Sequence, residues 1–424
     1  MHSLQHDNLY DILIAGGGLA GLLALTRLRQ IHPSAKILLI EKEQHLGGRL
    51  RVAQGKENVG AGGLHYVSKE LYEFLNRTLL SCSQGEEEYS LPSFETQVMG
   101  ILQGKKLDEL PLQELCTNRF AKILGGNSAA KQWDSFLDTL KKRNDELGPQ
   151  TLGKWTNISK KDPFLDVLNV MSIPLGIVSP WFATPVSFEQ RSHYIEQGLF
   201  AGPWVEFIDK LSRWSQSEIM TESTVLDASF TDKVWDLKLE KRNIYGKTLV
   251  VAQSPWEALP WLKRDHAPAN LINIALKYSP LSVVSLITKL DKEYEFLDRI
   301  LIPSEKSQVF KLSPQEICIQ VIIDYETFLD APRVVQAVKQ AKRSKAKFCK
   351  NFGFDEPKDE FLSLRSVAWT HDSHHDARKQ IDDYDVQKIN SKNLVFCGDS
   401  YGNSYDPDQN LIKSLLAACS TLVV

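Results

Sequence analysis

The stretch Asp11-Ile-Leu-Ile-Ala-Gly-Gly-Gly-Leu-Ala-Gly21 decides the fold of this chain of 424 residues. Its apolar run Ile12–Ala15 predicts a buried strand, and the following run Leu19–Gln30 predicts a helix. Three glycines connect the two at G-x-G-x-x-G spacing: Gly16, Gly18 and Gly21. A strand, a glycine-rich turn and a helix in this order are the context that a dinucleotide-binding site requires.

Each position of this turn has a task in such a site. Gly16 permits the tight turn, and Gly21 lets the helix pack closely against the strand. Gly18 lets the backbone approach a pyrophosphate, whose charge suits the N-terminus of the helix, where Leu19 and Ala20 lie. These residues are therefore predicted to bind the phosphates of a dinucleotide.

A second apolar strand, Ile37-Leu-Leu-Ile-Glu41, ends on a carboxylate. Glu41 follows Gly21 by twenty residues, which is the distance expected for a residue that accepts hydrogen bonds from ribose hydroxyls. Its charge would repel a 2′-phosphate. Lys42 directly after it is expected to lie at the same site.

Composition favours a globular protein that acts on a small molecule. Hydrophobic residues make up 42% and charged residues 24%, both ordinary values. Fifty basic and 53 acidic residues give a net charge of −3, so no basic field attracts nucleic acid or an anionic membrane. The length predicts two closely joined domains.

The six cysteines are scattered and form no C-x-x-C pair, which favours a reducing, cytoplasmic location over a disulfide framework or a zinc site. Cys397 lies in an apolar strand and is expected to be packed rather than to link a flavin. No signal peptide is visible. The apolar stretch Val167–Val186 contains three prolines, so a buried segment is favoured over a transmembrane span.

Periodicity predicts further elements along the chain. Helices are expected over Ser68–Leu80, much of 113–175, Gly198–Ser215, Pro332–Asn351 and Asn410–Leu422. Strands are expected within 91–112 around a turn at Gly104, and over Ser223–Phe230, Val234–Glu240, Thr248–Pro255, Val283–Leu290, Ile317–Asp324 and Asn393–Asp399.

Taken together, these blocks resemble the flavin-containing amine oxidase superfamily, which includes monoamine oxidases, renalase-like proteins, protoporphyrinogen oxidases and phytoene desaturase-like enzymes. The blocks are the glycine turn with Glu41, then Gly47-Gly48-Arg49, Asn58-Val-Gly-Ala-Gly-Gly63, Thr248–Pro255 and Phe396-Cys-Gly-Asp399. The resemblance implies an α/β fold. A Rossmann-like FAD-binding domain of the glutathione-reductase type would be joined to a second α+β substrate domain on a mixed sheet.

The resemblance also implies an alternating division of the chain. The FAD-binding domain would comprise 1–85, 196–262 and 366–424, and the substrate domain would comprise 86–195 and 263–365. FAD is the implied cofactor. The implied FAD-binding residues beyond those above are Gly47, Gly48, Arg49, Gly60, Ala61, Gly62, Gly63, Val225, Ser254, Gly398, Asp399, Gln409 and Asn410.

Each of these residues would bind a different part of the cofactor. The Gly-Gly-Arg block would lie along the diphosphate and flavin, Val225 and Ser254 would lie at the adenine, and Asp399 would bind a ribityl or phosphate oxygen. Gln409 and Asn410 would bring the last helix to the pyrimidine O2. This helix departs from the family pattern because Asp406–Ser414 is bulkier and more polar than the usual small residues.

Three residues are candidates for the catalytic side of the flavin. Trp369 stands where the family brings an aromatic ring to the flavin face, His65 follows the second glycine-rich block, and Tyr401 follows Gly398-Asp399. Three further histidines are at 371, 374 and 375. Their context reads as a loop, so no metal site is expected.

Three functions remain open from the sequence. The first is oxidation of an amine or other small reduced substrate by hydride transfer to flavin N5, with dioxygen as a possible electron acceptor. The second is a desaturase or porphyrinogen-type oxidase with an apolar substrate, for which 167–186 could line a tunnel. The third is a flavin-binding protein without turnover.

Overall fold

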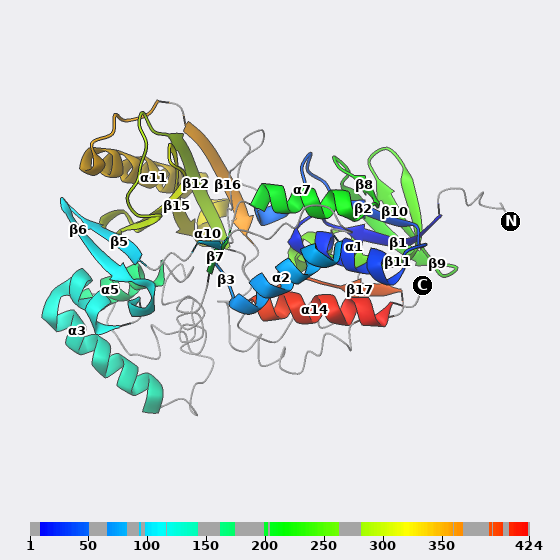
Figure 1. Ribbon diagram of the computed structural model, residues 1–424, viewed down its shortest axis with the longest axis horizontal. Helices are drawn as coiled ribbons and strands as arrows, with labels where there is room; N and C mark the ends of the chain where they lie inside the picture. The colour runs from blue at the N-terminus through cyan, green and yellow to red at the C-terminus, as the bar shows by residue number, and fades with distance from the viewer. Residues whose placement is uncertain are drawn as a thin grey trace.

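The computed structural model describes residues 9–50, 66–82, 93–94, 98–115, 117–142, 162–173, 199–201, 204–262, 281–358, 360–367, 390–391, 393–401 and 407–422. Within them the strands form two large sheets and one small sheet, and the two large sheets lie in opposite halves of the molecule (Figure 1). The α/β class with a Rossmann-like domain and a second mixed-sheet domain is therefore confirmed.

The first large sheet contains the quoted stretch. Its strands, in spatial order, are β8 (Glu218–Met220), β2 (Ile37–Ile40), β1 (Leu9–Ala15), β11 (Asn243–Val251), β10 (Val234–Leu239) and β9 (Val225–Thr231), with β17 (Leu394–Phe396) also paired to β11. Strands β8, β2, β1, β11 and β17 run parallel, whereas β9 and β10 run antiparallel to their neighbours.

The register brings distant segments to one edge of this sheet. Ala15 pairs with Ile40 on one side and Val251 on the other, and Val251 pairs with Phe396. The residues that follow these four therefore emerge side by side at the carboxyl ends of parallel strands. Ligands of open α/β sheets bind at this edge.

Helices cover one face of this sheet (Figure 1). They are α1 (Leu19–Ile31), α2 (Lys69–Cys82), α7 (Trp204–Trp214) and α14 (Pro407–Thr421). Their buried residues join Ile12, Ile14 and Val250 of the strands in one apolar cluster. The apolar spacing of each helix explains this packing, as in α7, where Trp204, Phe207, Ile208 and Leu211 are buried.

Two predicted helix starts were wrong. Residues before Trp204 were expected to be helical, but Leu199–Ala201 forms strand β7, which pairs with β3 (Tyr66–Val67) and β4 (Ser93–Phe94). Helix α14 begins at Pro407, three residues before the expected start. Proline suits the first turn of a helix because its missing N–H has no partner to lose there.

The second large sheet has the order β16 (Glu360–Val367), β12 (Leu281–Lys289), β15 (Glu316–Ile323), β14 (Ser307–Ser313), β13 (Arg299–Ile302), β5 (Val98–Gln103) and β6 (Lys106–Pro111). Only β13 and β5 pair in parallel among the described strand pairs of this sheet. The predicted turn at Gly104 joins β5 to β6, and its φ of +64° explains the glycine.

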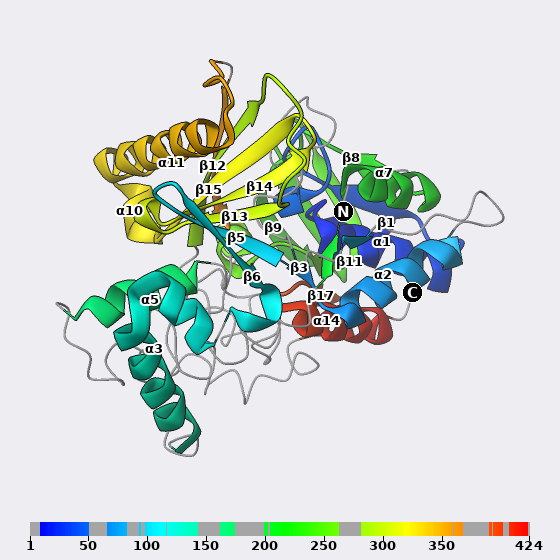
Figure 2. The same ribbon diagram turned by 60° about the vertical axis from the view of Figure 1, so that its left-hand side comes forward.

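Helices lie on both faces of the second sheet (Figure 2). Helices α10 (Tyr325–Leu329) and α11 (Ala331–Phe352) pack on one face. Helices α3 (Asn118–Lys142) and α5 (Pro163–Ser172) pack on β5, β6 and β13 from the other side. The proposed domain boundaries at 85, 195, 262 and 365 remain a prediction.

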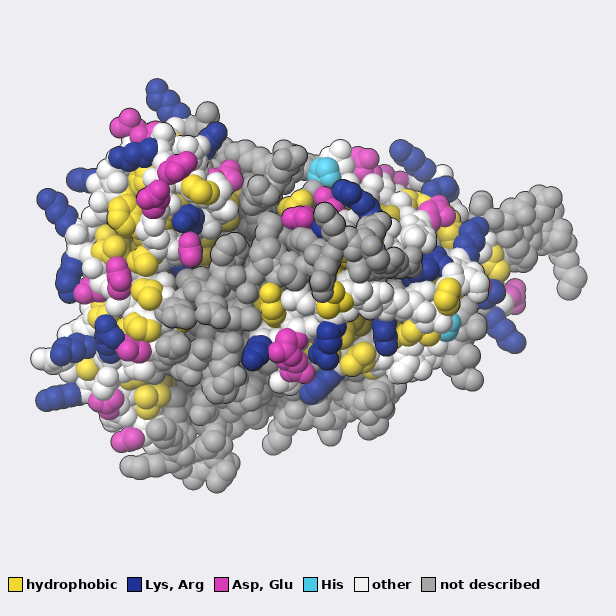
Figure 3. All heavy atoms as spheres, in the orientation of Figure 1, with side chains coloured by type: hydrophobic (Ala, Val, Ile, Leu, Met, Phe, Trp, Pro, Cys, Tyr) yellow, Lys and Arg dark blue, Asp and Glu magenta, His cyan; other side chains and the backbone are white. Residues whose placement is uncertain are grey.

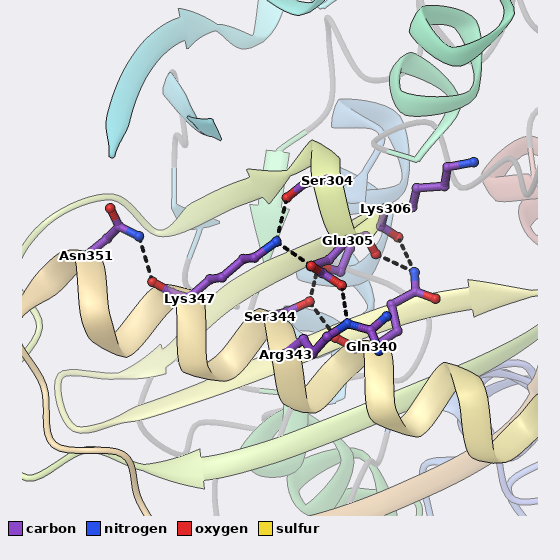
Figure 4. A network of polar contacts seen from close by, with 9 residues as sticks. Ser304, Glu305, Lys306, Gln340, Arg343, Ser344, Lys347 and Asn351 are labelled. Atoms are coloured by element: carbon purple, nitrogen blue, oxygen red, sulfur yellow. Dashed lines mark hydrogen bonds and ion pairs between the residues drawn. The ribbon is translucent and has the colours of Figure 1, made fainter. Parts of the chain in front are cut away.

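A polar cluster fastens α11 to the turn η5 (Pro303–Glu305) between β13 and β14 (Figure 4). The buried carboxylate of Glu305 accepts hydrogen bonds from Arg343 Nε at 2.8 Å and from Lys347 Nζ. Gln340 Nε2 donates to the backbone carbonyl of Glu305. Charge-assisted bonds of this kind hold the helix in place along the sheet.

The surface carries both signs of charge, and Figure 3 shows basic and acidic side chains interspersed over one face. Among the described helices, none is both long and apolar enough to cross a membrane. Four cysteines in the described part of the chain are free and buried: Cys318, Cys349, Cys397 and Cys419. Cys397 is fully buried, which agrees with the packed role expected for it.

Candidate cofactor-binding site

Contacts within the protein itself require glycine at two positions of the turn after β1. Gly16 has a φ of +110°, and a Cβ there would lie 2.9 Å from the carbonyl oxygen of Ala252. A Cβ on Gly21 would lie 1.8 Å from the carbonyl oxygen of Gly16. Both positions therefore need glycine for the turn and for helix packing, as the sequence predicted.

Gly18 differs from these two glycines. Its φ of −74° is open to any residue, and among the described residues beyond its chain neighbours a Cβ there would have only the Cα of Gly48 within 4 Å, at 3.9 Å. No side chain caps α1 at Gly18, and the first turn holds no acidic residue. The fold thus leaves an open, electropositive helix N-terminus beside a backbone without a side chain, which suits an anion.

The Gly-Gly-Arg block packs directly against this turn. The N–H of Gly47 donates to the carbonyl of Gly17 at 2.8 Å, and Gly47 forms a bridge with Gly18. Gly48 has a φ of +51°, and a Cβ there would lie 3.1 Å from the Cα of Gly18. These contacts bring Arg49 close to the N-terminus of α1.

Arg49 joins the two ends of the chain. Its Nη1 and Nη2 donate to the two carboxylate oxygens of Asp399 at 2.8 and 2.6 Å, across 350 residues of sequence. The side chains are 31% and 12% exposed, respectively. Burial alone would lower the pKa of Arg49, but the charge and hydrogen bonds of Asp399 outweigh it and raise that pKa.

Glu41 is buried at the same edge. Its carboxylate accepts hydrogen bonds from the backbone N–H of Gly17 at 2.6 Å and of Glu43 at 2.9 Å. Burial raises its pKa, although these two donors oppose the shift. Each oxygen keeps a further lone pair, so the side chain holds the turn and can still accept from a ribose hydroxyl.

Lys42 and Ser254 meet at a residue that sequence reasoning missed. Glu257, in the short helix α8 (Pro255–Ala258), accepts from Lys42 Nζ at 3.1 Å and from Ser254 Oγ at 3.0 Å. Burial would raise the pKa of Glu257, but the Lys42 charge and these hydrogen bonds lower it. Val225 is buried at the start of β9.

Helix α14 holds the Gly398-Asp399 turn. Gly398 has a φ of +143°, and its N–H donates to Ser414 Oγ at 2.9 Å. Asn410 is 2% exposed and donates through Nδ2 to the carbonyl of Asp399 at 3.2 Å, while Gln409 beside it is half-buried. Ser414 was also missed, because a lone serine within a helix carries no signal in the sequence.

Tyr401 lies in the core near this turn. Its side chain is 1% exposed, its ring lies 5.3 Å from that of Phe396, and its hydroxyl donates to the carbonyl of Gln253 at 2.6 Å. These contacts support a structural role. The predicted catalytic role of Tyr401 gains no support from them and stays a prediction.

Several predicted site residues lie outside the described part of the chain. They are Gly60, Ala61, Gly62, Gly63, His65 and Trp369, together with the three histidines at 371–375. Among the residues that the structure describes, no group of His, Cys, Asp and Glu side chains could hold a metal ion.

The described residues fit an anionic dinucleotide. They combine an uncapped helix N-terminus, a glycine backbone with open space beside it, a forked arginine and a buried carboxylate. Phosphate groups are recognised by the first three features, and ribose hydroxyls by the last. Asp399, from the C-terminal part of the chain, lies at the same edge of the first large sheet.

Comparison with known proteins agrees with this geometry. A family model described as an NAD(P)-binding Rossmann-like domain matches residues 14–78. Uncharacterized protein R188 of Acanthamoeba polyphaga mimivirus is 46% identical over 66 residues, which is 15% of this chain and 13% of the viral protein. This chain thus matches only a small part of that relative's length.

Solved structures match nearly the whole chain at low identity. A candidate protoporphyrinogen oxidase from Exiguobacterium sp. 255-15 has a TM-score of 0.62 and 16% identity over 97% of this chain and 99% of its own. Cyclohexylamine oxidase from Brevibacterium oxydans has a TM-score of 0.62 and 12% sequence identity, and the match covers 97% of each chain. Putrescine oxidase bound to putrescine has a TM-score of 0.63 and 12% sequence identity, and the match covers 97% of this chain and 98% of its own. This chain therefore shares its overall fold with these oxidase structures, in agreement with the fold that the sequence resemblance implied.

Proposed function

We propose that this protein is an FAD-dependent oxidoreductase that oxidises an amine or another small reduced substrate. Hydride transfer to flavin N5 would be the reaction, with dioxygen as a candidate electron acceptor. The neighbours in structure include oxidases of cyclohexylamine and putrescine, which supports a small-molecule substrate. The scattered buried cysteines support the proposed cytoplasmic location.

The observation that carries this proposal is the open backbone at Gly18. The fold would accept a side chain there, yet the residue is glycine and stands at the N-terminus of α1 beside Arg49. A bound diphosphate explains why a side chain is absent. The Arg49–Asp399 pair is a second observation in favour of FAD, because neither residue would have a role in a site that binds only NAD.

The remaining residues take roles along the cofactor. The N–H groups of Leu19 and Ala20 would face the diphosphate, and Glu41 would accept from the ribose. Val225 and Ser254 would lie at the adenine, with Lys42 close by.

Toward the isoalloxazine, Asp399 would approach the ribityl chain. Gln409 and Asn410 would bring the N-terminus of α14 toward the pyrimidine ring. When bound, FAD supplies the hydride acceptor, and the protein orients the donor.

Purified protein tests the cofactor directly. We expect a yellow protein with flavin absorbance that releases FAD, and not NAD, on denaturation. Gly18→Ala should fold with unchanged stability but retain little FAD. Gly104→Ala is the matched control, because it places alanine at a φ of +64° in an open turn and should lower stability without loss of FAD. A colourless protein that binds NAD alone would refute the proposal.

A donor panel separates the alternatives. Anaerobic bleaching of the flavin by amines favours the proposed activity, and bleaching only by a polyene or porphyrinogen favours an apolar substrate. No bleaching by any donor would indicate a binding protein without turnover. Hydrogen peroxide released during turnover in air would identify dioxygen as the acceptor.

A further inference from the structure

Two neighbouring residues at the ribose end of the cofactor-binding site carry opposite charges. Glu41 is the predicted acceptor for ribose hydroxyls, and a carboxylate there would repel a 2′-phosphate. Lys42 follows it directly, and a cationic side chain near this position accommodates the 2′-phosphate in sites that take NADP. The two side chains therefore favour different dinucleotides, and the contacts of Lys42 decide which preference applies.

Lys42 is paired with Glu257 across the end of β1. Its Nζ donates to Glu257 Oε1 at 3.1 Å. Lys42 follows β2 and Glu257 follows β11, and these two strands flank β1 on its two sides. The ion pair thus spans the carboxyl edge of the first large sheet at the strand that leads into the glycine turn. Ligands of such sheets bind at this edge.

The charges around Lys42 are mainly negative. Burial would lower the pKa of Lys42, but the charge of Glu257 and the hydrogen bond to it outweigh this effect and raise that pKa. Glu43 and Glu41 shift the pKa of Lys42 in the same direction as Glu257. Three carboxylates therefore act on this one ammonium group. A phosphate that approached Lys42 would have to compete with them.

Neither helix capping nor stability explains why Glu257 makes these contacts. Ser254 and Glu257 have the S-x-x-E spacing of a capping box, in which both side chains bond backbone N–H groups of the first helical turn. Ser254 makes no side-chain cap hydrogen bond, and its Oγ donates to Glu257 Oε2 at 3.0 Å instead. The side chains of Lys42 and Glu257 are 44% and 49% exposed, and ion pairs so exposed stabilise a fold little.

We propose that Glu257 is a specificity-determining residue, which pairs with Lys42 and thereby disfavours dinucleotides that carry a 2′-phosphate on the adenosine ribose. With Lys42 engaged, the carboxylate of Glu41 sets the preference, and the site takes an adenosine whose 2′-hydroxyl is free. FAD meets this condition and NADP does not. This inference rests on the proposed function and deepens it.

The test compares two nucleotides that differ by one phosphate. Protein freed of its cofactor is titrated with 5′-AMP and with adenosine 2′,5′-bisphosphate, and calorimetry measures both affinities. Circular dichroism checks that this protein stays folded. Wild type should bind 5′-AMP at least about tenfold more tightly than the bisphosphate, because like charges brought together at a binding site strongly oppose association.

Substitutions at Glu257 then test the residue. Glu257→Gln removes the charge that engages Lys42, so the bisphosphate should bind about fivefold more tightly than to wild type while 5′-AMP changes less. Glu257→Asp keeps the charge and should keep the wild-type preference. Glu240→Gln is the matched control, because it makes the same change of charge in the exposed turn at the amino end of β11. It should leave both affinities unchanged.

A gain in affinity for one nucleotide cannot result from damage to the fold, so the outcomes are distinguishable. A wild type that holds FAD but shows no preference for 5′-AMP overturns this inference and leaves the proposed function standing. The inference also fails if Glu257→Gln gains no affinity for the bisphosphate, or gains as much for 5′-AMP. A wild type that takes up neither FAD nor 5′-AMP overturns the proposed function itself.

Discussion

Replacing Asp399 with asparagine tests whether the Arg49–Asp399 pair holds the two ends of the chain together. The Asp399→Asn variant would keep the shape of the side chain and one acceptor oxygen but lose the charge. The change removes one of two charge-assisted hydrogen bonds, whose lengths are 2.8 and 2.6 Å. It leaves Arg49, with a side chain only 31% exposed, facing a neutral partner.

The expected loss can be worked from this geometry. A hydrogen bond to a charged group contributes roughly 1.5–3 kcal/mol, and the partial exposure of Arg49 lets water replace some of it. We therefore expect the free energy of unfolding of the cofactor-free protein to fall by about 1–2 kcal/mol. Urea unfolding followed by circular dichroism measures this change.

A double-mutant cycle separates the pair from other effects. Arg49→Gln and Asp399→Asn should show a coupling energy of about 1 kcal/mol, because each removes the same interaction. Asp298→Asn is the control, since Asp298 is 44% exposed and lies 3.7 Å from Lys311. Additive losses from the Arg49 and Asp399 variants would refute the reasoning that this pair fastens the site.

Two further predictions concern the fold. Gly21→Ala should lower the free energy of unfolding by about 3 kcal/mol or more, since its Cβ would lie 1.8 Å from a backbone oxygen; normal urea unfolding of this variant would contradict the packing described. Glu305→Gln should cost about 1–2 kcal/mol near neutral pH. Burial would raise the pKa of Glu305, but Lys347 and Arg343 lower it below its ordinary 4.5, so the gap between wild type and variant should be full above that pH and shrink as pH falls below it. A gap independent of pH would argue against a charged Glu305.

The first half of the site followed from local patterns in the sequence. Gly16, Gly21 and Glu41 stand where strand, turn and helix signals fix their positions, and each lies at the carboxyl edge of the sheet as expected. Asp399 was also singled out, because Gly-Asp ends an apolar run; the structure pairs it with Arg49, and its role at a cofactor stays a prediction. Such signals involve residues that are close in sequence. They predict the structure correctly because the local backbone geometry itself requires those residue types.

The supporting contacts could not be predicted in this way. Ser414 binds the N–H of Gly398, and Glu257 binds both Lys42 and Ser254. Each contact depends on how segments pack together, and neither residue type is unusual at its position in a helix. The predicted start of α7 was wrong for a related reason, since pairing with β3 and β4 decides the structure of Leu199–Ala201.

The glycines of the first turn separate what the fold requires from what a ligand requires. At Gly16 and Gly21 an added Cβ meets the protein's own backbone, so these residues would be glycine in any protein with this turn. At Gly18 an added Cβ would lie 3.9 Å from the Cα of Gly48 and φ is ordinary, so the described part of the fold gives no reason for glycine. The proposed explanation is a bound molecule that runs close to the backbone at the N-terminus of α1. If Gly18→Ala retained its cofactor in full, the space beside this residue would have no function in binding.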